Sequence, residues 1–387
     1  MKTVSETISG ASHLTCSNCG KIYNIHQQQT YASCCNQPLF TQYNGIHPAK
    51  ENLVNQPHHL WRYAAMLPVF DATNRISLEE GFTPMHTLHK ISAKYAVNRL
   101  CLKDEGVNPT GSFKARGLSV AISKAKELGI EHCIIPTAGN AGGAMSAYCA
   151  KAGIQATVVM PKSSAMLIKE EVQMFGAKLI EVNGFIHDCG KLVQQIAAET
   201  GAFDMSTMKE PYRLEGKKTL GYEIAEQLNW QLPDVIIYPT GGGTGLIGMW
   251  KAFAEMQQIQ WLNSSKKPRM VIVQTENCNP MIQMIEKGKK NESFQPSYSI
   301  ANGLVVPTPF AEKSMLRVIH ESKGTGVTVS ENDIQQGIRE IARTEGLLLS
   351  PEGAAAFAGF KKLVEKNWIE SQENVCIVNT GSWYKYH

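Results

Sequence analysis

The sequence predicts an α/β protein in which parallel β-strands are flanked by helices, and two observations support this fold class. Short apolar strands alternate with longer helical segments, most of which end at a glycine, as in βαβ units. The 387 residues are too many for a single small core and suit two domains. Hydrophobic residues make up 43% of the chain and charged residues 19%, as expected of a soluble globular protein.

The first series of elements follows an N-terminal part without clear periodicity. The composition of residues 1–60 predicts an irregular leader that holds the first cysteines, and a polar, proline-bearing stretch comes next. From Ile76 onward, strand and helix patterns alternate. The expected strands are 99–103, 131–135, 155–160 and 178–182, and the expected helices are 113–128, 141–152, 165–175 and 186–199. Gly153, Gly176 and Gly201 are stop signals for the last three helices.

A second series of elements begins after Arg213. Ser330 and Asp333 predict a capping box for a helix that ends at Thr344, and Pro351 is well placed at the start of the next helix. The other expected elements are a helix over 215–228 and strands over 234–238, 270–274 and 374–378.

The charge and hydropathy patterns exclude several classes of protein. The formal net charge is only +4 and the cations are dispersed, so the basic stripe of a nucleic-acid-binding protein is missing. No apolar run approaches the length of a membrane span, and the N-terminus lacks the pattern of a signal peptide. The chain has ten cysteines, and most of those after the N-terminal group lie in apolar runs, which indicates reduced, buried thiols. These patterns predict a cytoplasmic protein.

One loop could deliver a reactive amine. The segment Asn108–Lys114 is rich in proline, glycine and small polar residues, and it places Lys114 in the first turn of a helix. The helix dipole and partial burial both disfavour an ammonium there, which favours an amine nucleophile. Taken alone, an ordinary exposed helix lysine is the stronger interpretation.

Three further loops offer groups that bind anions or polar ligands. Thr240–Gly245 lies between a strand and a helix, where bare backbone amides can hold a phosphate or simply form a tight turn. Thr137–Gly142 offers amides for a carboxylate and the Asn140 side chain, although it could be a plain connection. Asn379–Ser382 follows the last strand, where hydroxyls of an open α/β sheet point into the ligand crevice, unless it is only a terminal turn.

The order of these four loops resembles the fold-type II pyridoxal 5′-phosphate (PLP) enzymes, over about residues 81–381. The resemblance implies two open, mostly parallel twisted sheets flanked by helices, with a small cysteine-containing N-terminal extension. The implied large PLP-binding domain comprises 61–110 and 216–387, and the implied smaller α/β domain is 111–215. Residues 1–60 form the extension. A homodimer is the family's usual assembly.

The resemblance also implies a role for each matching residue. Lys114 binds the PLP aldehyde and later moves protons, Phe113 borders the ring, Asn140 hydrogen-bonds the 3′-oxygen and Thr380 faces the pyridine nitrogen. The residues that hold the cofactor phosphate are Gly241, Gly242, Gly243, Thr244 and Gly245. The residues that contact the substrate are Ser112, Thr137, Gly139 and Arg213.

Within this family, the segment 211–219 (Pro-Tyr-Arg-Leu-Glu-Gly-Lys-Lys-Thr) is similar to the corresponding segment of threonine synthases, which convert O-phospho-L-homoserine and water to L-threonine and phosphate. Arg213 is then the candidate ligand of the substrate's phosphate, since guanidinium binds phosphate through two parallel bonds. A surface ion pair with Glu210 or Glu215 is an equally good interpretation.

Three departures keep the substrate open. One is the segment Ser350–Ala354 (Ser-Pro-Glu-Gly-Ala), a variant that several subfamilies share. Ala115 follows Lys114 as in many dehydratases, and the tail after Thr380 differs from the usual threonine synthase ending. A threonine or serine dehydratase, or another β-replacement enzyme, is therefore the alternative. A non-catalytic PLP or amino-acid binding protein is disfavoured by the intact Lys114.

The N-terminal cysteines raise the question of a metal. Cys16, Cys19, Cys34 and Cys35 could bind zinc through four thiolates. A regular zinc ribbon would place two residues between the cysteines of the second pair, and adjacent cysteines do not easily bind one ion. The pattern therefore resembles a knuckle that has lost a ligand, and His26 is a candidate substitute.

Overall fold

The computed structural model describes residues 9–44, 48–184, 186–291 and 293–386. The chain forms two compact units. Unit 1 comprises Met1–Phe82 and Lys114–Thr219, and unit 2 comprises Thr83–Phe113 and Leu220–His387. The domain boundaries expected from the sequence stay a prediction, because this division describes packing and does not test independent folding.

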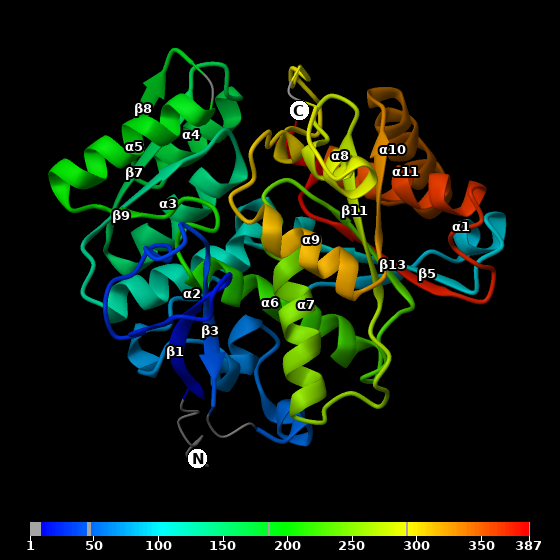
Figure 1. Ribbon diagram of the computed structural model, residues 1–387, viewed down its shortest axis with the longest axis horizontal. Helices are drawn as coiled ribbons and strands as arrows, with labels where there is room; N and C mark the ends of the chain where they lie inside the picture. The colour runs from blue at the N-terminus through cyan, green and yellow to red at the C-terminus, as the bar shows by residue number, and fades with distance from the viewer. Residues whose placement is uncertain (1–8, 45–47, 185, 292, 387) are drawn as a thin grey trace. The chain divides into compact units, whose positions relative to one another are not determined.

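Unit 1 is built on a four-stranded parallel sheet with the order β8-β7-β6-β9 (Figure 1). Its central strands are nearly continuous apolar runs, as expected when both faces of a parallel sheet are covered. A cluster around Ile134 and Val193 packs α5 on one face, and a second cluster holds α2 and α3. The strands are β6 (His132–Pro136), β7 (Gln155–Pro161), β8 (Lys178–Val182) and β9 (Phe203–Asp204), and the helices are α2 (Lys114–Glu127), α3 (Asn140–Ala152), α4 (Met166–Met174) and α5 (Ile186–Thr200).

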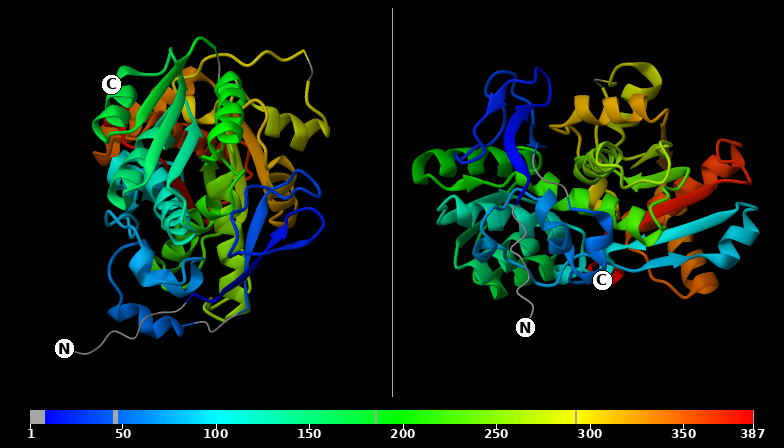
Figure 2. Two further views of the ribbon diagram at one scale, coloured as in Figure 1. Left: turned by 90° about the vertical axis from the view of Figure 1, so that its left-hand side faces the viewer. Right: turned by 90° about the horizontal axis from the view of Figure 1, so that it is seen from below.

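The N-terminal part of unit 1 is a small antiparallel sheet, which we call the ribbon (residues 11–43; Figure 2). Its strands are β1 (Ala11–Cys16), β2 (Ile22–Tyr23) and β3 (Leu39–Tyr43), in the order β2-β1-β3. The predicted irregular leader is therefore wrong over these residues, whereas residues 1–8 and 45–47 lie outside the described residues. Short 3-10 helices follow the ribbon at Lys50–Asn55, Leu60–Met66 and Ala72–Asn74.

Helix α6 (Tyr212–Gln227) begins three residues earlier than the sequence predicts. The carboxylate of Glu210 explains the difference, because it accepts hydrogen bonds from the backbone N–H groups of Tyr212 (2.7 Å) and Arg213 (3.0 Å). These N–H groups would otherwise lack acceptors at the helix start. Arg213 is consequently a helical residue in the first turn of α6.

Unit 2 contains a six-stranded sheet with the order β12-β11-β10-β13-β5-β4, in which β4 is antiparallel. Helix α11 lies over its centre, and α10 packs beside α11 (Figure 1). The strands are β4 (Met85–Thr87), β5 (Arg99–Asp104), β10 (Val235–Pro239), β11 (Arg269–Thr275), β12 (Thr325–Val329) and β13 (Asn374–Asn379). The helices are α1 (His89–Lys94), α7 (Thr244–Gln258), α8 (Pro280–Lys287), α9 (Glu312–Glu321), α10 (Glu331–Glu345) and α11 (Pro351–Glu365).

The helix signals read from the sequence are confirmed in unit 2. Ser330 and Asp333 form both hydrogen bonds of a capping box at the start of α10, and Pro351 is the first residue of α11. The predicted α/β class with two mostly parallel sheets is confirmed as well. In the part of the chain that the structure describes, no helix has the length and apolarity that a membrane crossing requires.

Candidate active site

Three neighbouring parallel strands of unit 2, β10, β13 and β5, carry the predicted loops at one edge of the sheet. Gly241–Gly245 follow β10, Thr380 follows β13, and residues 105–113 follow β5. Ligands of open α/β sheets bind at the carboxyl ends of the strands. The structure thus brings the predicted phosphate loop and the predicted hydroxyl loop of unit 2 to the same edge.

The loop before Lys114 is locked onto the chain that follows β13. The backbone N–H of Phe113 donates to the carbonyl of Thr380 (3.1 Å), and the N–H of Ser382 donates to the carbonyl of Gly111 (2.8 Å). Thr110 and Gly111 both have left-handed backbone angles (φ 59° and 63°), which turn the loop back on itself. Lys114 directly follows this anchored segment as the half-buried first residue of α2.

Ser112 is an unsatisfied polar group inside this loop. The residue is fully buried, and its Oγ has no hydrogen-bond partner among the described residues. Buried hydroxyls normally have partners, so an orphan of this kind needs an explanation. A ligand that bears hydrogen-bonding groups at this edge of the sheet would provide one.

The glycine-rich loop after β10 has no room for side chains. A Cβ atom added to Gly241 would lie 2.4 Å from the carbonyl oxygen of Gly303, and one added to Gly243 would lie 2.2 Å from the sulfur of Met315. Gly243 also has φ +77° and is the N-cap of α7, where it supplies no side-chain cap. The loop is thus a close-packed turn that presents the backbone amides at the start of a fifteen-residue helix. This is the usual geometry for binding a phosphate.

Glu352, which was not predicted as a site residue from the sequence, supports this loop through Gly303. Its Oε1 accepts the N–H of Gly303 (2.8 Å), the residue against which Gly241 packs. The side chain is buried, and its Oε2 has no partner in the described part of the chain. The available signal was its place in the Ser350–Ala354 segment, directly after the helix-starting Pro351.

In unit 1, the Thr137–Asn140 loop ends β6 and starts α3. Thr137 Oγ1 accepts the N–H of Gly139 (3.1 Å), which shapes the turn. Gly139 is the N-cap of α3 without a side-chain acceptor, and Asn140 is the first, half-buried helical residue. The loop therefore presents the start of α3 and an amide side chain, as the sequence predicts for a carboxylate and a polar oxygen ligand.

Arg213 is buried, so the predicted surface ion pair is the wrong alternative. The side chain is 1% exposed, and its Nη1 donates to the carbonyl of Met205 (2.6 Å), just after β9. Its Nε and Nη2 atoms are buried and have no acceptor among the described residues. Glu215 instead pairs with Lys218 (2.6 Å). Burying a guanidinium with two donor atoms that lack acceptors costs free energy, unless an anion accepts their hydrogen bonds.

The carboxyl of Glu210, three residues before Arg213, interacts electrostatically with this guanidinium. Burial raises the pKa of Glu210 to about 7, although Arg213 and the backbone N–H groups of Tyr212 and Arg213 lower it. Part of the population is therefore neutral near pH 7, and a neutral carboxyl does not compensate the charge of Arg213. Burial lowers the pKa of Arg213 as well, but a guanidinium remains charged at any pH of interest.

Close packing of two helices fixes Arg213 relative to the start of α2. A Cβ atom at Gly117 would lie 2.9 Å from the carbonyl oxygen of Arg213, and one at Gly216 would lie 2.0 Å from that of Arg116. The two glycines thus let the backbones of α2 and α6 touch. Since Gly117 is one turn beyond Lys114, the first turn of α6 is held next to the first turns of α2.

Taken separately, each unit carries donor groups of the kinds that bind a PLP molecule. Unit 2 offers a glycine cradle at a helix start for the phosphate, a neutral hydroxyl at Thr380 and an orphaned hydroxyl at Ser112. Unit 1 offers the amine of Lys114 and the amide of Asn140, each at the start of a helix. Position 380 itself is a threonine rather than a carboxylate, so a pyridine nitrogen that faces it would not be forced to carry a proton.

The predicted metal ligands also lie together. The sulfur atoms of Cys16, Cys19, Cys34 and Cys35 are all within 4.8 Å of one another in the ribbon. The ring of His26, the substitute considered from the sequence, packs on the ring of Phe70 instead (4.9 Å between centroids).

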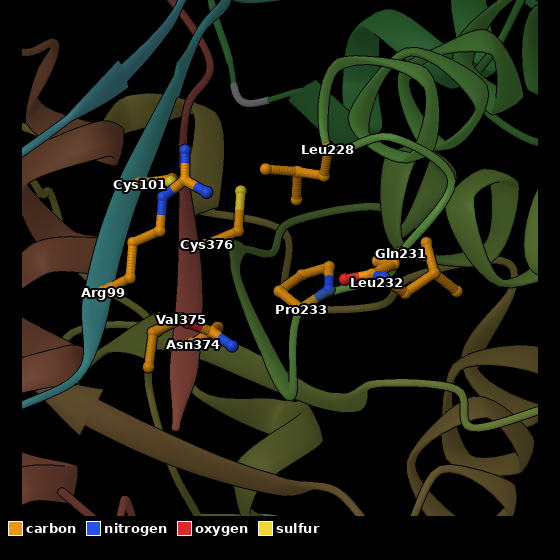
Figure 3. Close-up of a pocket in the computed structure, with 9 residues that line it drawn as sticks. All are labelled: Arg99, Cys101, Leu228, Gln231, Leu232, Pro233, Asn374, Val375 and Cys376. Atoms are coloured by element: carbon orange, nitrogen blue, oxygen red, sulfur yellow. The ribbon is translucent and has the colours of Figure 1, made fainter. Parts of the chain in front are cut away.

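A cavity of about 100 Å³ lies at the opposite edge of the unit 2 sheet (Figure 3). The guanidinium of Arg99 and the sulfur of Cys376 face it from the amino-terminal halves of β5 and β13. It is smaller than the several hundred Å³ of a typical cofactor pocket. Its lining residues are Arg99, Cys101, Leu228, Gln231, Leu232, Pro233, Asn374, Val375 and Cys376. None of the predicted site residues contributes to it.

Comparisons with known proteins identify the family of the chain. The family model described as "Pyridoxal-phosphate dependent enzyme" matches residues 76–381. Threonine synthase of Methanocaldococcus jannaschii is 32% identical over 375 residues, which cover 96% of this chain and 92% of that protein. Threonine synthase of Bacillus sp. is 34% identical over 327 residues, which cover 84% of this chain and 89% of that protein.

Solved structures support the fold. The processed form of threonine deaminase isoform 2 from Solanum lycopersicum aligns with a TM-score of 0.66 at 20% identity, over 78% of this chain and 79% of that chain. Maize serine racemase aligns with a TM-score of 0.66 at 22% identity, over 78% of this chain and 88% of that chain.

Proposed function

Since the chain belongs to the pyridoxal-phosphate-dependent enzymes and, among them, to the threonine synthase family, we propose that it converts O-phospho-L-homoserine and water to L-threonine and inorganic phosphate. The observation that carries this proposal is Arg213, whose Nε and Nη2 are buried without an acceptor among the described residues. A substrate phosphate supplies two oxygens in the geometry that a guanidinium fork matches. Threonine or serine brings no second anion that would need this group.

The chain's own residues would hold the cofactor and the substrate at separate anchor points. The residues that would hold the cofactor phosphate at the start of α7 are Gly241, Gly242, Gly243, Thr244 and Gly245. Bound PLP supplies an electron sink for negative charge that develops at the substrate's α-carbon. Asn140 would donate to the 3′-oxygen, Phe113 would border the ring, and Thr380 would leave the pyridine nitrogen without an enforced proton.

Other residues orient the amino acid. In unit 1, the Thr137–Gly139 turn would bind the substrate carboxylate through the start of α3, because the N–H groups of Thr137 and Gly139 themselves already donate to Val159 and to Thr137 Oγ1. In unit 2, Ser112 Oγ lacks a partner among the described residues and would bind a polar group of the ligand. Arg213 binds the phosphate at the other end of the substrate. Fixing both ends leaves the α-, β- and γ-carbons with little freedom, which is the usual way in which an enzyme contributes orientation.

Lys114 moves protons. Its Nζ removes the proton from the α-carbon, and it serves as a general acid–base group for the later proton transfers. Over the whole reaction, one proton leaves the β-carbon, the bond between the γ-carbon and the phosphate oxygen breaks, and the γ-carbon gains a proton. Water then gives its hydroxyl to the β-carbon, and a proton returns to the α-carbon. The sum is one phosphohomoserine and one water in, and one threonine and one phosphate out.

The proposal extends to the setting of the enzyme. We place it in the cytoplasm, as a homodimer that acts on a phosphorylated amino acid, in line with its reduced cysteines and family. Light scattering on a size-exclusion column measures the assembly directly.

The decisive experiment offers the purified protein three substrates in parallel. We expect phosphate release and threonine formation from O-phospho-L-homoserine, and visible absorbance of bound PLP that changes when this substrate is added. Ammonia and a 2-oxo acid from L-threonine or L-serine, with phosphohomoserine inert, would instead identify a dehydratase. Unchanged absorbance with all three compounds would point to a protein without this chemistry.

A further inference from the structure

The ribbon contains two turns that share one backbone geometry. In the first, the N–H of Cys16 donates to the carbonyl of Lys21 (2.9 Å), and the N–H of Gly20 donates to the carbonyl of Cys16 (3.0 Å). Gly20 has a left-handed conformation (φ +74°). The backbone N–H groups of Asn18 and Cys19 point at the sulfur of Cys16. This turn therefore already presents donors to a sulfur that would carry negative charge.

The second turn, which begins at Ala32, repeats this pattern. The N–H of Ala32 donates to the carbonyl of Gln37 (2.8 Å), and the N–H of Asn36 donates to the carbonyl of Ala32 (2.8 Å). Asn36 has the left-handed angle that Gly20 has in the first turn (φ +50°). Ala32 thus has the position in the second turn that Cys16 has in the first, and Cys35 has the position that corresponds to Cys19. The second turn has kept its shape but has no sulfur at its first position.

Cys34 supplies the missing sulfur from inside the turn. Its Sγ lies 3.4 Å from that of Cys19, and all four sulfurs lie within 4.8 Å of one another. Neighbouring side chains of an extended strand point in opposite directions. Residues 33–36 instead form a turn, which allows Cys34 and Cys35 to point to one place. The amide of Asn18 additionally donates to the sulfur of Cys35 (3.5 Å).

We propose that Cys16, Cys19, Cys34 and Cys35 bind one structural zinc ion as four thiolates, with Cys34 replacing the ligand that a regular ribbon has at position 32. Zinc–sulfur bonds of about 2.3 Å place tetrahedral sulfurs about 3.8 Å apart, so the observed spacings need only small adjustments. Four protein ligands fill the coordination shell, which is characteristic of structural rather than catalytic zinc.

The ion would stabilise a segment that packs on α6, the helix of unit 1 that carries Arg213. Tyr43, at the end of β3, donates to Glu215 of α6 (2.8 Å), and the ammonium of Lys218 lies 3.7 Å from the centre of the Tyr43 ring. Tyr212 donates to the carbonyl of Ile25 in the ribbon (3.4 Å). The ribbon has few apolar residues of its own, and a small unit of this kind commonly depends on a metal for its fold.

Elemental analysis of the full chain, purified without chelators, tests the proposal independently of enzyme activity. We expect about one zinc per chain, as four-ligand structural sites hold one ion. Replacement by Co²⁺ should give the intense visible bands of a tetrahedral cobalt thiolate, a readout that needs no variant. Cys34→Ser should lose the zinc, whereas the matched control Cys189→Ser, which alters a buried thiol of α5, should keep it.

A ligand-transfer variant tests the role of Cys34 itself. Ala32→Cys combined with Cys34→Ser restores the regular spacing, and we expect it to recover zinc. A double variant that stays metal-free, or a Cys34→Ser protein that retains full zinc, would overturn the assignment of Cys34. The zinc proposal fails as a whole if the parent protein contains none, or contains iron instead. It also fails if the denatured chain shows two titratable thiols fewer than its ten cysteines, since this would identify a disulfide.

Discussion

Replacing Arg213 with leucine should weaken catalysis with the phosphorylated substrate by about two orders of magnitude. Two donor atoms of this guanidinium, Nε and Nη2, have no acceptor among the described residues and are available to the phosphate. Hydrogen bonds to charged groups contribute about 1.5–3 kcal/mol each. Two bonds at the lower end give about 3 kcal/mol, or a roughly 150-fold loss in kcat/KM, at about 1.4 kcal/mol per factor of ten.

The assay is phosphate release from O-phospho-L-homoserine, together with inhibition by inorganic phosphate. Lys124→Met is the matched control, because Lys124 is also a buried cation of unit 1 but pairs with Glu127 (2.6 Å). We expect the control to lose thermal stability and keep its kcat/KM. Arg213→Leu should show little change in melting temperature, since it removes an incompletely paired buried charge. A kcat/KM equal to that of the parent protein would refute the assignment of Arg213.

Three further outcomes follow from the site. Lys114→Ala should abolish threonine formation, while the circular dichroism spectrum stays unchanged. Turnover near the rate of the parent protein would exclude Lys114 as the proton-transfer group. Gly241→Ala should weaken PLP retention at least tenfold in dialysis experiments, because the new Cβ would lie 2.4 Å from the backbone oxygen of Gly303. Full retention of PLP would argue against binding of its phosphate by this loop. Burial raises the pKa of Glu210 to about 7, so its neutral form contributes stability below the ordinary carboxyl pKa, and this contribution is lost as the pH rises through 7. Glu210→Gln should therefore flatten the fall in melting temperature between the ordinary carboxyl pKa of 4.5 and about pH 7. An unchanged pH profile over this range would contradict the raised pKa.

The sequence reveals the loops of the site because each loop depends on residue types that have few other uses. Glycines at 241 and 243 are required by contacts with Gly303 and Met315 that no larger residue tolerates, and a run of such glycines is visible in the sequence. Helix stop signals and the capping box of Ser330 and Asp333 are local interactions, so they could be read directly. Local requirements of this kind are the part of the fold that sequence patterns predict well.

The missed features depend on partners that are distant in sequence. The strands of the ribbon are short, and their apolar side chains are buried only because Leu118 and Tyr212 share a cluster with Leu14 and Leu39. The alternative of a surface ion pair for Arg213 was wrong for the same reason. Arg213 is buried because α2 and α6 pack closely together. The early start of α6 depends on the Glu210 side chain rather than on periodicity. Such contacts have no signature in a single sequence.

The pairing of the ribbon with α6 has a consequence for protein synthesis. Tyr43 leaves the ribosome 172 residues before its partner Glu215. At about 5–20 residues per second, the interval is roughly 10–35 s. The strand-pairing hydrogen bonds of the ribbon join residues 11–43 only, so it can form during this time. Its contacts with α6, including the hydrogen bond from Tyr212 to Ile25, form only after α6 emerges. Nascent chains that stall before residue 212 should therefore bind chaperones more strongly than chains that have passed residue 227.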